Sequence, residues 1–274
     1  TFVPMNEIKE ISSLQNPLVK KILLLKEKSR ERKKEGRFIL EGRRELELAL
    51  KGGYEIDALL FYNAIISEED VLTITADIEL AVDLISVSKE VYQKIVYRET
   101  TEGVLAIAKA KLHELEQLQF KTKKPLILVA EAPEKPGNIG ALLRTADAAN
   151  LDAVIIANPK TDLYNPNIIR SSVGCIFTRN IAIGNTSDII SYLKENKISI
   201  FCAALSASKE YSKIDYKEPT AIVVGTEDSG LTDAWLQHST QNIIIPMEGE
   251  IDSMNVSVSA AILIFEAKRQ RLEE

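Results

Sequence analysis

The apolar positions of this chain follow two different patterns, which change between residues 109 and 124. In the first region, short apolar runs alternate with amphipathic stretches, and this predicts a small α/β unit. Its predicted strands cover 37–40, 55–62, 84–87 and 103–108, and its predicted helices cover 17–34, 43–50 and 89–95. Residues 1–12 show neither pattern, so we expect a loose or extended lead-in.

Beyond residue 125 the apolar runs become continuous and mostly alternate with helical patterns. The predicted strands cover 126–130, 153–157, 181–183, 198–204, 221–225 and 242–246. The predicted helices cover 139–149, 167–176, 187–196, 233–238 and 253–272. Strands that are apolar on both faces and separated by helices predict a parallel sheet covered on both sides. Residues 109–124 carry both charge signs and no β-branched run, which predicts a helical linker.

The composition narrows the class of protein. A chain of 274 residues with 45% hydrophobic residues can bury a sizeable core, as one large domain or two smaller ones. Two cysteines and two histidines are too few for a disulfide framework or for the usual zinc and hydrolase sites. We see no membrane span and no signal peptide. We therefore expect a cytoplasmic protein with neither membrane nor metal partners.

The net charge of −6 is unevenly distributed. Residues 16–45 hold eleven basic and five acidic residues, a net charge of +6, so the remainder carries −12. Such a basic stretch is a typical footprint for nucleic acid. A solvated helix face explains it equally well, because Glu27, Glu31 and Glu35 lie at helical spacing from the lysines. The candidate RNA-binding residues are Lys20, Lys21, Arg30, Arg32, Lys33, Lys34, Arg37, Arg43 and Arg44.

Polar residues follow the first predicted strand of the second region. Gly137 and Asn138 are turn residues, and we expect Asn138 to cap the helix that begins at Ile139. Arg144 lies two turns into that helix among small and apolar residues. Such an arginine either extends to solvent or faces an anion.

Two further strand ends carry candidate chemistry. Gly225 and Gly230 allow a tight turn after 221–224, although a plain glycine turn with a surface acid would look similar. Pro246 ends the last strand, and we expect Ser253 to cap the final helix, at a helix end suited to anions. An ordinary strand–loop–helix corner is the alternative here. In a parallel sheet all three strand ends meet at the edge where ligands bind.

These residues together resemble the three ordered motifs of the SpoU (TrmH-like) RNA 2′-O-ribose methyltransferases of the SPOUT superfamily. The motifs are Asn138-x5-Arg144, Gly225-x-Glu227-x-x-Gly230-Leu231, and Ile245-Pro246-x6-Ser253-x-Asn255-Val256-Ser257-x-Ser259. Thr226 departs from the commoner asparagine of the second motif. Phe38–Gly42 and Glu99–Ala108 resemble, more loosely, the family's L30e-like substrate-binding domain.

The resemblance implies an α/β protein with an L30e-like RNA-binding domain at 1–108, a linker at 109–124 and a SPOUT domain at 125–274. In the latter it implies a parallel sheet with a deep trefoil knot, and a homodimer formed through the knots. S-adenosyl-L-methionine would bind at Gly225, Thr226, Glu227, Gly230, Ile245, Pro246, Met247, Met254, Asn255 and Ser259.

The resemblance also implies a reaction, the 2′-O-methylation of an RNA ribose. Arg144 would act as the general base or as a positioning group, with Asn138, Glu227, Ser253 and Asn255 orienting it and the ribose. The L30e-like module favours 23S rRNA as the substrate, with tRNA as the alternative. A non-catalytic RNA-binding or ribosome assembly factor, and a small-molecule enzyme, are the competing classes.

Overall fold

The computed structural model describes residues 8–76, 82–97, 102–206, 208–226 and 228–272. The chain divides into two compact units. The first comprises Thr1–Lys111 and Asp162–Thr178, and the second comprises Leu112–Thr161 and Arg179–Glu274. A segment from the second half of the chain is therefore part of the first unit.

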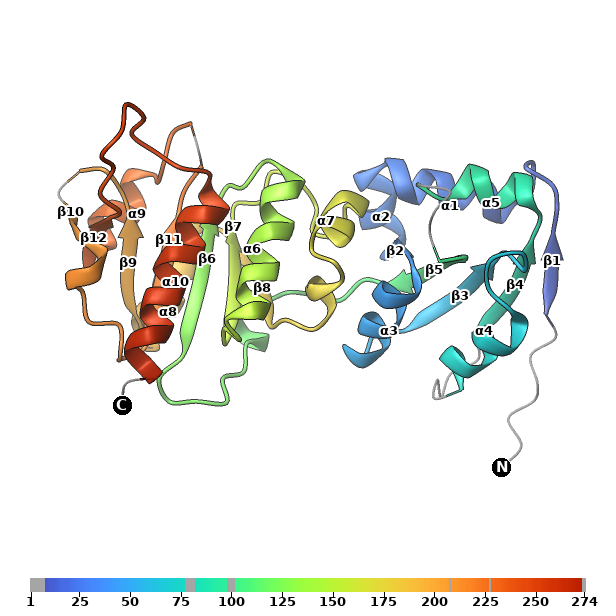
Figure 1. Cartoon of the computed structure of the whole chain (residues 1–274), viewed down its shortest axis with the longest axis horizontal. Helices are drawn as coiled ribbons and strands as arrows, with labels where there is room; N and C mark the ends of the chain where they lie inside the picture. Colours follow the sequence, from blue (N-terminus) through green and yellow to red (C-terminus); the bar gives the residue numbers. More distant parts are fainter. Residues whose placement is uncertain (1–7, 77–81, 98–101, 207, 227, 273–274) are drawn as a thin grey trace. The chain divides into compact units, whose positions relative to one another are not determined.

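The first unit contains a five-stranded sheet in the order β1-β4-β3-β5-β2. Strand β5 is antiparallel to β2 and β3, whereas β4 is parallel to β1 and β3. Figure 1 shows α1 and α5 along one face of this sheet, and α3 and α4 along the other. The elements up to Lys109 are β1 (Lys9–Ile11), α1 (Pro17–Glu27), α2 (Ser29–Glu35), β2 (Arg37–Glu41), α3 (Arg43–Lys51), β3 (Ile56–Phe61), α4 (Glu68–Thr75), β4 (Asp83–Val87), α5 (Lys89–Ile95) and β5 (Val104–Lys109).

The strands and helices predicted for this region are confirmed, with three differences. The single helix predicted over 17–34 is two helices, because Lys28 takes an extended conformation between them. Helix α4, which Ser67 caps, was not predicted. Strand β1 lies in the predicted lead-in, and its three residues find a partner only through tertiary pairing with β4.

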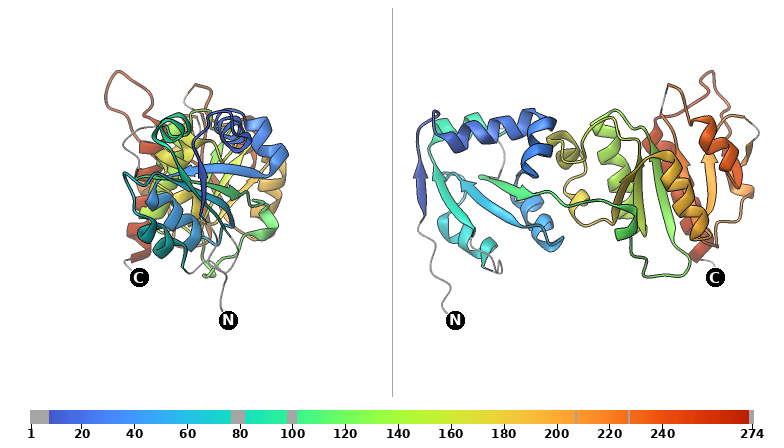
Figure 2. Two further views of the ribbon diagram at one scale, coloured as in Figure 1. Left: turned by 90° about the vertical axis from the view of Figure 1, so that its right-hand side faces the viewer. Right: turned by 180° about the vertical axis from the view of Figure 1, so that it is seen from behind.

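The second unit contains a seven-stranded sheet in the order β10-β12-β9-β11-β6-β7-β8. All its paired strands are parallel, as predicted. Figures 1 and 2 show α6 and α10 on one face, and α8 and α9 on the other. The elements are β6 (Leu126–Glu131), α6 (Pro136–Ala148), β7 (Ala153–Ala157), β8 (Ile181–Gly184), α8 (Thr186–Glu195), β9 (Ser199–Ala203), β10 (Ser208–Glu210), β11 (Thr220–Val224), α9 (Asp233–His238), β12 (Gln241–Ile244) and α10 (Val256–Leu272), with 3-10 turns at Leu115–Gln117 and Tyr211–Lys213.

The predicted helical linker is wrong. Between β5 and β6 the chain forms only one short turn, at Leu115–Gln117. Leu115 and Leu118 are buried in the core of the second unit beside Ile127 and Val129. An irregular path delivers both leucines to that core, so burial overrides local helix propensity.

The segment Asp162–Thr178 packs into the core of the first unit. It holds helix α7 (Pro166–Ser171) and a 3-10 turn at Cys175–Phe177. The ring of Tyr164 stacks on that of Phe38 with 4.2 Å between ring centres, and Phe177 meets Tyr54 edge-on at 5.1 Å. Aromatic pairs of this kind contribute beyond the area that they bury. The first unit therefore needs residues that follow β7 in the sequence.

A buried ion pair also holds this segment. The guanidinium of Arg32 contacts the carboxylate of Asp162, with 3.1 Å between Nε and Oδ1, and the two side chains are 5% and 8% exposed. Nη1 of Arg32 donates to the carbonyl oxygens of Leu25 and Lys26. The guanidinium thus makes four hydrogen bonds inside the protein, which compensate for the burial of its charge.

Within the described residues, no helix is both long and apolar enough to cross a membrane.

Candidate active site at the carboxyl ends of parallel strands

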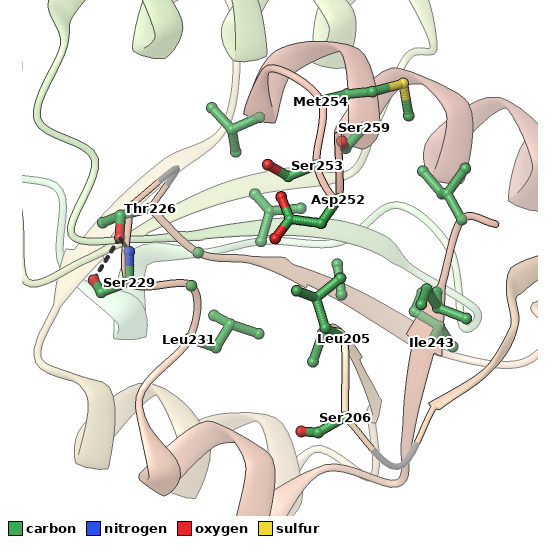
Figure 3. Close-up of a pocket in the computed structure, with 18 of the residues that line it drawn as sticks. Leu205, Ser206, Thr226, Ser229, Leu231, Ile243, Asp252, Ser253, Met254 and Ser259 are labelled. Atoms are coloured by element: carbon green, nitrogen blue, oxygen red, sulfur yellow. Dashed lines mark hydrogen bonds between the residues drawn. The ribbon is translucent and has the colours of Figure 1, made fainter. Parts of the chain in front are cut away.

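A cavity of about 400 Å³ opens at the carboxyl ends of β9, β11 and β12 (Figure 3). Its walls come from the residues after these strands and from the chain that leads into α10. Its volume falls in the range of small-molecule sites, and its position is the edge where parallel sheets bind ligands. The lining includes Ala203–Ser206, Val224–Thr226, Asp228–Leu231, Ile243–Ile245, Met247, Asp252–Met254, Val256 and Ser259.

The loop after β11 is a small hydrogen-bonded turn. The backbone N–H groups of Thr226 and Gly230 each donate to the other residue's carbonyl, both at 3.1 Å. The hydroxyls of Thr226 and Ser229 lie 2.8 Å apart (Figure 3). A Cβ atom on Gly225 would lie 2.2 Å from the carbonyl carbon of Gly230, so glycine is required there. Glu227, a predicted catalytic and cofactor-binding residue, lies outside the described residues.

The chain between β12 and α10 forms another wall. The prediction that Ser253 caps the last helix is wrong, because α10 begins at Val256. Asn255 caps it instead: its Oδ1 accepts from the N–H of Ser257 at 3.0 Å, and its carbonyl accepts from the N–H of Val258 at 2.9 Å. Ser253 and Met254 therefore lie in the loop before the helix, where both line the cavity.

The first motif lies on α6. Asn138 does not cap this helix, because α6 begins two residues earlier at Pro136, and proline favours the first helical position. The side-chain amide of Asn255 donates to Oδ1 of Asn138 over 3.2 Å. This bond joins the first and third motifs. Arg144 is exposed on α6, and neither it nor Asn138 lines the cavity.

The cavity contains most of the predicted cofactor-binding residues. Gly225, Thr226, Gly230, Ile245, Met247, Met254 and Ser259 line it. Pro246 and Asn255 are not among the lining residues. Leu205 and Ser206 after β9, as well as Asp252, also line the cavity and were not predicted. The signal for the first two was available, since β9 was a predicted strand of the same parallel sheet.

A buried carboxylate at the end of β6 was also missed. Glu131 is 3% exposed, and it accepts hydrogen bonds from the N–H and hydroxyl of Thr232, both at 2.9 Å. It also accepts from the hydroxyl of Thr186 at 3.1 Å. Because Thr232 directly follows the loop after β11, Glu131 holds one end of that loop in place.

The predicted RNA-binding residues separate into two groups. Lys20, Lys21, Arg30, Lys33 and Lys34 are exposed on α1 and α2, and Arg43 and Arg44 are exposed at the start of α3. Arg37 is partly buried and bonds to Asp57. Arg32 is buried and paired with Asp162, so its guanidinium cannot reach an RNA phosphate, and its prediction as an RNA-binding residue is wrong.

The cavity has the chemistry that S-adenosyl-L-methionine requires. Figure 3 shows apolar side chains such as Leu205, Leu231 and Ile243, which suit an adenine ring, together with the carboxylate of Asp252. A carboxylate favours the positive charges of a sulfonium and an amino group. The backbone exposed by Gly225 can meet polar edges of a ligand closely.

The fold and this site define an α/β protein with a small-molecule pocket at the carboxyl edge of its parallel sheet. Residues of the second and third motifs line this pocket. Residues 125–265 match the model of the SpoU rRNA Methylase family, and residues 16–106 match that of the MRM3-like substrate binding domain. The chain belongs to the SpoU rRNA methylase family.

Relatives extend the similarity over nearly the whole chain. The 23S rRNA (guanosine(2553)-2'-O)-methyltransferase RlmP of Bacillus subtilis is 30% identical, over 94% of this chain and 98% of RlmP. A crystal structure of an RNA 2'-O ribose methyltransferase is 37% identical with a TM-score of 0.81, over 96% of this chain and 99% of that one. An AdoMet-bound rRNA methyltransferase from Sinorhizobium meliloti is 28% identical with a TM-score of 0.87, over 96% and 98% of the two chains.

Proposed function

We propose that this protein transfers a methyl group from S-adenosyl-L-methionine to a ribose 2′-hydroxyl of 23S rRNA. The observation that carries the proposal is the convergence of the three motifs. The second and third motifs line one cavity at the carboxyl edge of the sheet, and the bond between Asn255 and Asn138 joins the first motif to them. Family membership supports the same reaction.

The methyl donor would bind in this cavity. Gly225, Thr226 and Gly230 would present backbone groups to it, and Met254 and Ser259 would line the opposite side. Glu227, Pro246 and Asn255 stay in the proposed site on the strength of the motifs. When bound, the cofactor supplies an activated methyl group on its sulfonium. The trefoil knot of the family stays a prediction for this chain.

Arg144 is the residue that we propose to activate the ribose 2′-hydroxyl for methyl transfer. General-base help is typically worth about 10²–10⁴-fold, but an arginine normally stays protonated. A protonated Arg144 would hold the nucleotide phosphate and stabilise the alkoxide as it forms. Asn138, held by Asn255, and Ser253 at the cavity wall would orient the ribose.

We assign RNA binding to the first unit, which joins the predicted domain 1–108 to Asp162–Thr178. We assign methyl transfer to the second unit, which holds the rest of the predicted domain 125–274 and most of the predicted linker 109–124. The exposed lysines and arginines of α1, α2 and the start of α3 would contact phosphates. RNA affinity should then fall steeply with added salt. Relatives differ in their target base, since RlmP is named for a guanosine and a Streptomyces viridochromogenes relative for a uridine.

We also propose a cytoplasmic homodimer. Val258 and Phe265 lie seven residues apart on one face of α10 and are 48% and 49% exposed. A second copy would cover this apolar surface and complete each site. Sedimentation of Phe265→Glu tests it, because a charge at the interface should yield monomers.

The test of the reaction uses S-adenosylmethionine with a labelled methyl group and total RNA from cells lacking this protein. Label in 23S rRNA, lost in Arg144→Ala while calorimetry shows intact cofactor binding, is the expected result. Lys194→Ala is the control, because Lys194 is exposed in the last turn of α8, on the other face of the sheet from α6 and α10. Label in tRNA would keep the proposed reaction but identify tRNA, and not 23S rRNA, as the substrate. The absence of both label and cofactor binding would leave a non-catalytic RNA-binding protein.

A further inference from the structure

The first unit contains a cavity of about 300 Å³. Its walls come from α1, β2, the start of α3, the end of α5 and helix α7. All its lining residues belong to the first unit, and within the described residues it shares none with the cofactor cavity. Its lining is rich in charged side chains, which sets it apart from a void in the core.

Tyr97 forms a stacking surface at this cavity. Tyr97 is 56% exposed, and the guanidinium carbon of Arg170 lies 4.3 Å from the centre of its ring. The ammonium of Lys26 lies 5.9 Å from the same centre. The carboxylate of Glu41 accepts the backbone N–H of Tyr97, at 3.0 and 2.8 Å for its two oxygens, which fixes the residue. Unpaired RNA bases stack on planes of this kind, both aromatic rings and guanidinium groups.

Carboxylates supply acceptors beside this surface. Glu41, Glu45 and Glu102 line the cavity together with Arg44. One oxygen of Glu102 accepts the backbone N–H groups of Arg43 and Arg44, at 2.6 and 3.2 Å. The cavity therefore offers hydrogen-bond acceptors to an incoming group that carries N–H donors, and cations to a phosphate.

The cavity is held in place before any ligand arrives. Helix α7 contributes Arg170, and its Ile168 and Ile169 are buried. The buried pair of Arg32 with Asp162 anchors the same segment. A site whose side chains are already fixed binds with a smaller entropic cost.

We propose that this cavity binds one unpaired guanosine nucleotide of the RNA substrate. The base stacks on the surface formed by Tyr97 and Arg170. Guanine is the base expected, because its imino and amino N–H groups lie side by side. They match the two oxygens of one of the carboxylates that line the cavity, those of Glu41, Glu45 and Glu102. Arg44 faces the phosphate. The inference rests on the proposed function for the identity of the RNA, but the cavity itself can be tested without methyl transfer.

The first experiment is saturation-transfer NMR on the full chain with GMP, AMP, CMP and UMP. We expect GMP to bind most tightly, and Tyr97→Ala and Arg170→Ala to weaken it on the order of tenfold, as loss of a stacking partner does. Tyr97→Phe keeps the ring and should bind GMP like the wild type. Lys51→Ala is the charge control, because Lys51 is exposed at the far end of α3. Equal signals from all four nucleotides, or no effect of Tyr97→Ala, would overturn the proposal.

The second experiment separates this proposal from the proposed function. In methyl transfer to 23S rRNA, Tyr97→Ala should raise KM for RNA on the order of tenfold while kcat and cofactor affinity stay unchanged. An unchanged KM, with active wild-type enzyme, would overturn the cavity's role and leave the methyltransferase standing. If the wild type methylates no RNA, the proposed function fails, and the GMP titration alone then decides whether the cavity binds a nucleotide.

Discussion

The two cavities of this protein are lined by different kinds of residue. The cofactor cavity is lined by aliphatic side chains, such as Ile243, together with small residues that leave backbone exposed, such as Gly225 and Ser253. The cavity of the first unit is lined by long charged and aromatic side chains, such as Tyr97 and Arg170. Backbone groups at strand ends are positioned by the sheet itself, whereas long side chains need partners to hold them. A cavity positioned by the sheet suits a ligand that stays the same. A cavity made of long side chains can acquire a different ligand when those side chains are substituted.

The largest expected effect concerns the anchor of the nucleotide cavity. Asp162→Ala leaves the buried guanidinium of Arg32 without its carboxylate, which should lower the free energy of unfolding by about 3–5 kcal/mol. Cofactor affinity should not change, because Asp162 belongs to the first unit. Urea unfolding and calorimetry measure the two quantities.

The matched control for this substitution is an exposed pair. Lys9 and Asp83 lie 2.7 Å apart with 60% and 58% exposed side chains, so Asp83→Ala should cost less than about 1 kcal/mol. The double variant Arg32→Met with Asp162→Leu should recover most of the loss, because it removes both buried charges. Loss of cofactor binding in Asp162→Ala would break the separation of the two cavities.

The next effect concerns the backbone of the cofactor cavity. In Gly225→Ala the new Cβ would meet the backbone of Gly230 at 2.2 Å, so the loop must shift. We expect affinity for S-adenosylmethionine to fall on the order of a hundredfold, from a strain of about 1–3 kcal/mol. Gly249→Ala is the control, because a Cβ there meets nothing within 4 Å. Equal affinity in both variants would mean that loop geometry does not set cofactor binding.

A smaller effect is expected at the buried carboxylate that holds the same loop. In Glu131→Gln one acceptor oxygen becomes a donor that faces the donors of Thr186 and Thr232. We expect a loss of about 1–2 kcal/mol in urea unfolding, together with weaker cofactor binding. Glu134→Gln, on an exposed side chain nearby, should stay within about 0.5 kcal/mol. A neutral result at Glu131 would remove it from the loop's support.

The smallest effect concerns the two cysteines, one in each unit. Burial raises the pKa of the Cys202 thiol to about 12, so this group stays protonated and unreactive at neutral pH. Cys175 in the first unit is partly exposed. A thiol reagent should label Cys175 in the native protein and Cys202 only on unfolding, and Cys175→Ser should abolish the fast phase. Fast labelling in Cys175→Ser would show that the sheet opens readily.

The sequence predicts the cofactor edge well because its signals are local. Continuous apolar runs mark the buried parallel strands, and the residues after two strands, such as Gly225 and Met254, line the cavity. The helix starts were less predictable. Helix α6 begins at Pro136, two residues before Asn138, which was expected to cap it. Helix α10 is capped by Asn255, whereas Ser253 was expected to cap it. Several residue types can cap a helix, so local sequence leaves the choice open.

The nucleotide cavity was not predictable, because it depends on packing between distant segments. No local pattern shows that Arg32 turns inward while its neighbours Lys33 and Lys34 face solvent. Its carboxylate partner lies 130 residues away in the sequence. The predicted helix at 167–176 was found in part as α7, but its docking on the first unit follows only from tertiary contacts.

The return of Asp162–Thr178 to the first unit affects the order of events during synthesis. The ribosome releases Phe38 and Tyr54 well before Tyr164 and Phe177, the rings that they pack against. At about 5–20 residues per second, this delay is on the order of ten seconds. The amino-terminal unit therefore emerges with exposed aromatic rings. It cannot complete its core until Asp162–Thr178 has been synthesised, while the methyltransferase sheet is still incomplete.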